Sequence, residues 1–309
     1  MLGLWQQLPV LGSSTVVEAK IIGVRVEPIG ELKWTDNENL QVGDATFFLT
    51  IDPDVMTSSK SDSNQFLLAK RKSMVESLIE KAPGRIDNIF DLGIFKGGSV
   101  ALYNELFRPR RLVGIELSHY RVTALDEFIA QHSLGEIIHL YYGTLQHDRE
   151  RLTSIVRDEF GDERLDLVVD DCSHKYEQTK ATLNVLFPRL RPGGLYLIED
   201  WGSSHWPADH WQGRSNKYAK EQNPLSRLIL ELVMVSASRP GLVQRVDIDG
   251  STAYVTRGDE PVSDTDFDIS KSYLTAGRKI LNKRTRLGVP TGQQVRNFVH
   301  HHSPRRPTT

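Results

Sequence analysis

The sequence predicts an α/β fold: a doubly wound, mostly parallel sheet that ends in an antiparallel C-terminal hairpin. Between residues 85 and 200, short apolar runs alternate with stretches of helical periodicity, a pattern typical of βαβ units. A last helical stretch is followed by two further strands joined near Asp249 and Gly250, and so short a connection requires an antiparallel pair. We therefore expect five parallel strands closed by this hairpin, preceded by a smaller β-rich segment.

Each expected element follows from its local pattern. The runs rich in β-branched and large apolar residues predict parallel strands at 86–92, 111–117, 137–142, 165–170 and 194–198. The intervening periodic stretches predict helices at 98–107, 119–132, 148–160 and 175–190. A helix at 224–238 and hairpin strands at 243–248 and 252–256 complete the sheet. We find no internal repeat.

The ends of the chain differ from this pattern. Residues 15–51 predict strands, the polar stretch 57–64 predicts a loop or linker, and the spacing over 65–81 predicts a helix. We therefore divide the chain into a β-rich segment with a helix at 1–80, a main domain at 81–258 and a basic extension at 259–309. The first segment is expected to shape an acceptor pocket or an oligomer interface. The extension, which has no acidic residue after 269, is expected to be solvated, with docking on phosphates or an anionic membrane as the alternative.

Composition excludes several classes of protein. With 38 basic and 40 acidic residues the net charge is -2, which argues against a nucleic-acid binder. A single cysteine, Cys172, excludes an intramolecular disulfide and a cysteine-based zinc site. No apolar run is long enough for a membrane span, and the first nine residues lack the features of a signal peptide. We expect a cytoplasmic protein that forms a homo-oligomer.

A glycine-rich turn follows the first parallel strand and indicates a nucleoside site. Asp91 precedes Gly93, Gly97 and Gly98 in a G-x-x-x-G-G spacing, which differs from the G-x-G-x-x-G of dinucleotide enzymes. Glycines at such a turn let the backbone approach a ligand closely, and Ser99 is expected to cap the following helix. The spacing resembles the motif that binds S-adenosylmethionine.

Acids and amides at the next two strand ends support the same site. Glu116 ends the second strand, where a carboxylate accepts hydrogen bonds from both ribose hydroxyls. After the third strand, Gln146 and Asp148 lie where an adenine would bind, with capping of the next helix as the alternative for Asp148.

Four carboxylates follow the fourth and fifth strands and predict a cation site. They are Asp170, Asp171, Glu199 and Asp200, and the carboxyl ends of parallel strands meet at one edge of a sheet. Acids this close repel one another unless a cation binds them, and oxygen ligands favour Mg²⁺, Ca²⁺ or Mn²⁺ over zinc. His174 follows closely, with a structural histidine as the alternative to a catalytic one.

Residues 85–205, which hold these motifs, resemble the metal-dependent sugar O-methyltransferases of macrolide biosynthesis. The likeness rests on the loop at 91–99, on Asp171-Cys172-Ser173-His174 and on the run from Leu186 to Asp200. It implies a class I, Rossmann-like methyltransferase that uses S-adenosylmethionine and Mg²⁺. It further implies that Asp171, Glu199 and Asp200 bind the metal and that His174 is the general base. The family usually has glycine where this chain has Cys172.

The expected reaction is therefore methyl transfer to a hydroxyl of a glycoside or similar polyol. A divalent cation lowers the hydroxyl pKa and a histidine accepts the proton. Trp201, Trp206 and Trp211, together with His205 and His210, suit a loop that closes over a sugar, with local packing as the alternative. A second metal site at His205, Asp209 and His210 is a weaker hypothesis. An NAD-linked oxidoreductase and a non-catalytic interaction protein on the same scaffold are the competing functions.

Overall fold

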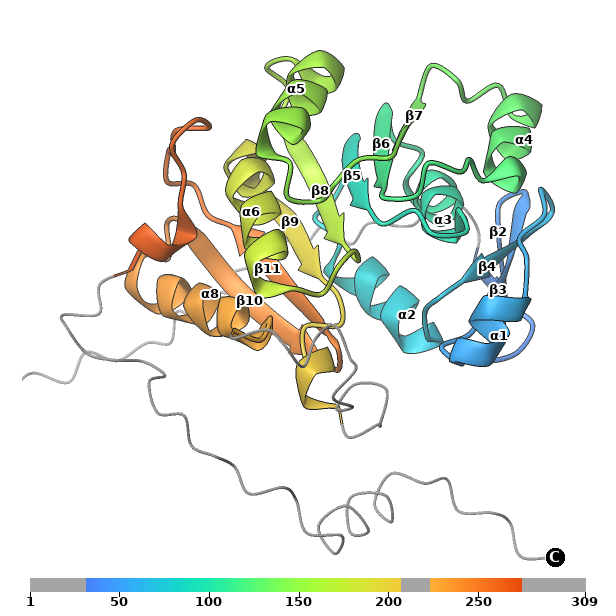
Figure 1. Ribbon diagram of the computed structural model, residues 1–309, viewed down its shortest axis with the longest axis horizontal. Helices are drawn as coiled ribbons and strands as arrows, with labels where there is room; N and C mark the ends of the chain where they lie inside the picture. Colours follow the sequence, from blue (N-terminus) through green and yellow to red (C-terminus); the bar gives the residue numbers. More distant parts are fainter. Residues whose placement is uncertain (1–31, 207–222, 274–309) are drawn as a thin grey trace, which may run out of the picture.

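The computed structural model describes residues 32–206 and 223–273, which form two sheets. The smaller sheet has the strand order β1-β2-β3-β4, and the larger has the order β10-β11-β9-β8-β5-β6-β7 (Figure 1). The strands predicted between 15 and 31 lie outside the described residues.

The larger sheet confirms the predicted fold class. Its parallel strands are β5 (Asn88–Leu92), β6 (Arg111–Glu116), β7 (Ile138–Tyr142), β8 (Leu165–Asp170) and β9 (Leu190–Ile198). The hairpin of β10 (Val243–Asp249) and β11 (Thr252–Arg257) pairs antiparallel to β9. Strand β5 has β6 on one side and β8 on the other, so the strand order reverses there, at the point where ligands bind in open α/β sheets.

Helices cover both faces of this sheet because successive strand residues point to opposite faces. In β5, Ile89 joins one buried apolar cluster and Phe90 joins the other. The first face packs against α3 (Gly98–Phe107) and α4 (Thr123–Gln131). The second packs against α5 (Arg149–Phe160), α6 (Tyr176–Leu186) and α8 (Ser226–Ser238).

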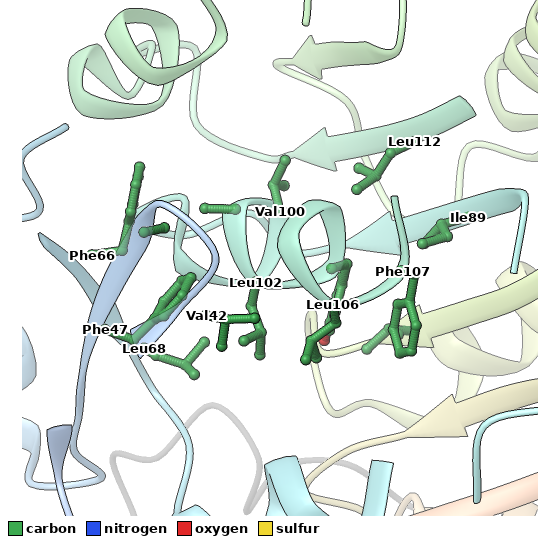
Figure 2. Close-up of a cluster of buried hydrophobic side chains, with 14 of the residues drawn as sticks. Val42, Phe47, Phe66, Leu68, Ile89, Val100, Leu102, Leu106, Phe107 and Leu112 are labelled. Carbon is green, nitrogen blue, oxygen red and sulfur yellow. The ribbon is translucent and has the colours of Figure 1, made fainter. Parts of the chain in front are cut away.

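The smaller sheet lies against α3, on the side of that helix away from the larger sheet. Its elements are β1 (Leu32–Trp34), β2 (Asn39–Val42), β3 (Ala45–Leu49), α1 (Pro53–Ser58), β4 (Gln65–Leu68) and then α2 (Lys72–Lys81). Figure 2 shows side chains of both sheets gathered around α3, with Phe47, Phe66 and Leu68 from one sheet and Ile89 and Leu112 from the other. The two sheets therefore share one core.

The helix predicted over 65–81 is wrong in its first part. Residues 65–68 form β4, which pairs parallel to β3, and α2 begins only at Lys72. Phe66, Leu67 and Leu68 are all buried, and a short, continuously apolar run of this kind fits a strand better than one face of a helix.

The helix predicted over 175–190 is also too long. It ends at Leu186, and a short 3₁₀ turn, Phe187–Arg189, leads into β9, which begins at Leu190 rather than at 194. Pro188 explains the ending, because proline lacks the amide hydrogen that an α-helix needs. The helix predicted from 119 begins at Thr123.

The first residues of the predicted basic extension pack on the main core. Phe267 and Ile269 are buried in the second cluster, and the Asn184 side chain accepts a hydrogen bond of 3.0 Å from the Ile269 amide. Residues 274–309, with most of the basic charges, lie outside the described residues. In the described part of the chain, no helix is both long and apolar enough to span a membrane.

Candidate functional site

The glycine loop after β5 has the tight geometry that the sequence predicts. Gly93 and Gly97 have φ angles of +99° and +87°, which side chains rarely permit. A Cβ on Gly93 would overlap the carbonyl oxygen of Asp171, so the loop after β5 lies directly against the loop after β8. The predicted cap by Ser99 is wrong: Gly97 occupies the cap position, and the Ser99 hydroxyl donates to Asp91 Oδ2 at 2.7 Å.

Asp91 is fully buried at the end of β5. Burial raises its pKa to about 7, although the bond from Ser99 and the charge of Lys70 oppose the increase. Its second oxygen, Oδ1, has no hydrogen-bond partner among the described residues. A buried acceptor without a donor is costly, and it marks a position where a ligand could supply the missing hydrogen.

Glu116 connects the glycine loop to the end of β6. Its two carboxylate oxygens accept hydrogen bonds from the amides of Phe95 and Ser118, each at 2.9 Å. Phe95 has a φ of +49° and is about half exposed, with 49% of its surface accessible. A carboxylate has about four acceptor positions, so Glu116 can still accept further hydrogen bonds.

Gln146 and Asp148 face different parts of the structure. The buried Gln146 amide donates to Asp170 Oδ1 at 2.6 Å and accepts from the Ser173 amide at 3.2 Å, which joins the loops after β7 and β8. Asp148 is the N-cap of α5 and accepts from the Arg151 amide at 3.0 Å. Asp148 therefore caps α5, which was the alternative interpretation of this residue. A role of Gln146 and Asp148 in binding adenine stays a prediction.

Three of the predicted site residues converge beside the glycine loop. Asp171, His174 and Asp200 each offer a ligand atom, and all three atoms lie within 4.8 Å of one another. His174 Nε2 is 4.0 Å from Asp171 Oδ1 and 3.9 Å from Asp200 Oδ2. His174 Nδ1 is buried and has no hydrogen-bond partner among the described residues.

The backbone of this cluster is strained. His174 and Asp200 have φ angles of +55° and +53°, in the left-handed region that favours glycine. Residues that keep such conformations without a glycine tend to cluster at functional sites.

Glu199, also predicted as a metal ligand, is buried and paired with a lysine. Lys70 Nζ lies 2.6 Å from both carboxylate oxygens of Glu199 and 3.2 Å from Asp171 Oδ2. Lys70 follows β4 in the N-terminal segment, so the chain reaches this site from a region that the sequence motifs do not mark. Its only signal in the sequence is a lysine directly after the apolar run 66–69.

Burial and neighbouring charges shift the pKa values of these acids in opposite directions. Burial raises the pKa of Asp170 to about 7, even though Tyr196 and Gln146 donate hydrogen bonds to its carboxylate. Burial also raises the pKa of Asp200. For Asp171, burial favours the neutral acid, but the charges of Lys70 and His174 outweigh it and hold the pKa below its usual value.

Cys172 and the tryptophan segment lie around this cluster. Burial raises the pKa of the Cys172 thiol well above its usual value, so the side chain is a neutral thiol packed on the second core cluster. Trp201 packs on the same cluster, and His205 shares a 2.7 Å hydrogen bond with Ser226. Trp211, His210 and Asp209 lie outside the described residues, so the lid and the second metal site stay predictions.

The region that holds this site matches a known family profile. Residues 90–201 match the profile of a family described as a methyltransferase domain. This range begins in β5 and ends after Asp200, so it contains the glycine loop and the four acids.

Curated relatives confirm the resemblance to macrocin- and mycinamicin-type enzymes. The chain is 32% identical over 114 residues to mycinamicin VI 2''-O-methyltransferase of Micromonospora griseorubida, a match to 36% of this chain and 24% of that protein. It is 37% identical over 111 residues to demethylmacrocin O-methyltransferase of Streptomyces fradiae, covering 36% and 25%. The chain thus matches about a quarter of the length of each relative.

Solved structures give a weaker similarity. A MycE methyltransferase of the mycinamycin pathway, in complex with Mg and SAH, is 22% identical and aligns with 60% of this chain and 49% of its own, at a TM-score of 0.44.

Proposed function

We propose that this chain is an S-adenosylmethionine-dependent O-methyltransferase that acts, with a divalent cation such as Mg²⁺, on a hydroxyl of a glycoside or polyol. The observation that carries this proposal is the direct contact of the glycine loop at Gly93 with Asp171. It brings a predicted nucleoside site against a cluster of acids and a histidine. Cytoplasmic location and a homo-oligomeric state remain predictions.

The residues around the loop fit S-adenosylmethionine, which supplies the activated methyl group. The buried Asp91 Oδ1 has no donor among the residues that the structure describes, and the α-amino group of the cofactor carries donors and a positive charge. Glu116 stands at the end of β6, already oriented by two backbone amides, and keeps acceptor positions for ribose hydroxyls.

The acid cluster fits a divalent cation, which lowers the pKa of an acceptor hydroxyl. Asp171 and Asp200 present oxygens to the space that His174 Nε2 also faces. Asp171, Glu199 and Asp200 are the proposed ligands, because oxygen donors are what Mg²⁺ prefers. His174 Nε2 lies about 4 Å from an oxygen of Asp171 and of Asp200, so the base stands beside the cation site.

In the proposed reaction, His174 accepts the hydroxyl proton at Nε2. The acceptor oxygen forms a bond to the methyl carbon as the bond from carbon to sulfur breaks, so S-adenosylhomocysteine leaves. The loops after β5, β8 and β9 hold the two substrates in line, and such positioning contributes up to roughly 7–11 kcal/mol in favourable cases.

The proposal is tested by incubating the protein with S-adenosylmethionine and a panel of glycosides, with a mass increase of one methyl group as the readout. Asp171→Asn removes an acidic ligand and should require a higher Mg²⁺ concentration for half-maximal rate, by roughly tenfold or more. An unchanged Mg²⁺ requirement in this variant would show that Asp171 is not a ligand. Absence of any methylated product, together with absence of cofactor binding, would refute the proposed function.

A further inference from the structure

The connection that carries His174 ends at a buried tyrosine. Tyr176 is the first residue of α6, two positions after His174, and only 2% of its surface is exposed. Among the described residues, no side chain caps the start of α6. The place where this helix begins therefore depends on what Tyr176 contacts in the rest of the fold.

The Tyr176 hydroxyl is bonded to a buried acid of another helix. It donates to Oε1 of Glu231, in α8, at 2.7 Å. The same oxygen accepts from Arg227 Nε at 3.1 Å, and the other oxygen, Oε2, accepts from the Ser270 hydroxyl at 3.4 Å. Because a buried carboxylate is stable only when its oxygens are satisfied, these donors fix Glu231 and so fix the acceptor of the tyrosine.

Two cations also pack on the ring of Tyr176. The Arg227 guanidinium lies 5.0 Å from the ring centroid, and Lys180 Nζ lies 5.4 Å from it. Contacts of this kind stabilise the orientation of the ring as well as the position of its hydroxyl. All of these groups lie outside the glycine loop and the acid cluster.

A second anchor lies on the other side of His174. The Ser173 amide donates to Oε1 of the buried Gln146 at 3.2 Å. His174, with its φ of +55°, therefore stands between a backbone anchor at Ser173 and a side-chain anchor at Tyr176. A residue with a Cβ keeps such a conformation only where the surrounding structure holds it.

We propose that Tyr176 is a positioning residue that, through its hydrogen bond to Glu231, holds the His174 ring beside Asp171 and Asp200. The inference rests on the proposed function, since His174 is the proton acceptor of that reaction. Tyr176 acts through the backbone between residues 174 and 176, so its hydroxyl takes no part in the methyl transfer itself.

The test compares Tyr176→Phe with two matched variants of the full chain. Tyr176→Phe removes only the hydroxyl. Glu231→Gln keeps an acceptor oxygen for the tyrosine and removes the charge. Tyr141→Phe removes an equivalent hydrogen bond from a tyrosine to a glutamate, Glu159, between β7 and α5.

The first readout is the NMR signal of the His174 ring in histidine-labelled protein, assigned by its absence in His174→Gln. Neither cofactor nor acceptor is needed for it. Tyr176→Phe should shift or broaden this signal, whereas Glu231→Gln and Tyr141→Phe should leave it at the wild-type position. An unchanged signal in Tyr176→Phe, or an equal change in either of the other variants, would overturn the inference.

The second readout is the rate of methyl transfer to the glycoside that gains the most methyl in the panel described above. Tyr176→Phe should lower kcat roughly 10–100-fold and leave the affinity for S-adenosylhomocysteine within about twofold of wild type, because only the base is misplaced. Glu231→Gln and Tyr141→Phe should keep rates close to wild type. A loss of rate in Tyr141→Phe as large as in Tyr176→Phe would also contradict the inference.

Failure of the proposed function gives a different result. If the wild type methylates no glycoside, that function fails, and the NMR comparison still decides whether Tyr176 positions His174. Urea unfolding midpoints of Tyr176→Phe and Tyr141→Phe should decrease by similar amounts, so a general loss of stability cannot account for an effect confined to Tyr176→Phe.

Discussion

His174 holds the central position of the proposed reaction in a backbone conformation that most residues avoid. Its φ of +55° costs about 1–2 kcal/mol for a residue with a Cβ. The surrounding loops maintain this conformation, and the result is a ring whose Nε2 lies about equally far from Asp171 and Asp200. Substitutions at His174 can separate the effect of losing the proton acceptor from the effect of relieving the backbone strain.

Replacing His174 with alanine or glycine should affect activity equally and stability differently. Both changes remove the proton acceptor, so methyl transfer should fall by roughly 10²–10⁴-fold while affinity for S-adenosylhomocysteine stays the same. Glycine relieves the strain, so His174→Gly should be more stable than His174→Ala by about 1 kcal/mol in urea unfolding. Loss of cofactor affinity in either variant would contradict the assigned role.

Asp91 makes stability depend on pH. Burial raises its pKa from 3.8 to about 7, so the folded state keeps this proton over a pH range in which the unfolded chain has lost it. The free energy of unfolding should therefore decrease as pH rises from about 4 to 7. Asp91→Asn removes this contribution and can still accept the Ser99 hydrogen bond.

The measurement is urea unfolding of wild type and Asp91→Asn at several pH values. The stability difference, variant minus wild type, should become more positive between pH 4 and pH 8, by up to about 4 kcal/mol. A difference that is constant across this range would mean that the pKa of Asp91 is not raised.

At the scale of elements, helix α3 lies between the two sheets and packs closely on β4 at its first residue, Gly98. A Cβ on Gly98 would overlap the backbone carbonyl oxygen of Leu67 in β4, which cannot move aside as a flexible side chain would. Gly98→Ala should therefore destabilise the protein by about 1–3 kcal/mol, despite the higher helix propensity of alanine.

Gly135→Ala is the matched control for that change. A Cβ at Gly135 would meet nothing within 4 Å, and the residue is exposed. Its unfolding free energy should stay within about 0.5 kcal/mol of wild type. Equal effects of the two substitutions would argue against close packing of α3 on β4.

Element prediction succeeded where strands and helices alternate regularly and failed in the apolar run that contains β4. The alternation over 85–200 predicted the five parallel strands of the larger sheet, including β5 and β8, which are buried along their whole length. The short connection near Asp249 predicted the closing hairpin. The run at 66–69 gave no such signal, because Phe66, Leu67 and Leu68 are consecutive buried residues that lead directly into the periodic pattern of α2.

At the scale of the whole molecule, the two sheets share a core. Phe66 of β4 lies 6.1 Å from Phe47 of β3 and 5.4 Å from Phe128 of α4, measured between ring centroids. The smaller sheet therefore buries apolar side chains against helices that also cover the larger one. We expect both sheets to unfold together.

This expectation is tested with fluorescence of Trp34, in the smaller sheet, and Trp201, beside β9, after the other tryptophans are replaced with phenylalanine. Both probes should report one urea transition with the same midpoint. Phe66→Ala should shift that midpoint for both probes, with a loss of about 3–5 kcal/mol. Two separate transitions, or a shift seen by only one probe, would show that the sheets are independent.

Only those site residues that lie at the ends of strands could be predicted from the sequence. The site acids lie at or just after the carboxyl ends of parallel strands, and the topology of such sheets brings these ends to one edge; they are Asp91, Glu116, Asp171 and Asp200. Lys70 could not be found this way, because its place depends on how the smaller sheet docks on α3. The ion pair between Lys70 and Glu199 depends on that docking, and no spacing in the sequence records it.

The most direct test of the account is calorimetric titration of the protein with S-adenosylhomocysteine, in Mg²⁺ and again in EDTA, with NAD as the control ligand. We expect one binding site for S-adenosylhomocysteine in both buffers and no heat from NAD, because the glycine loop binds the cofactor without needing the cation. Absence of binding by S-adenosylhomocysteine, or clear binding of NAD, would contradict the methyltransferase assignment and favour the competing functions.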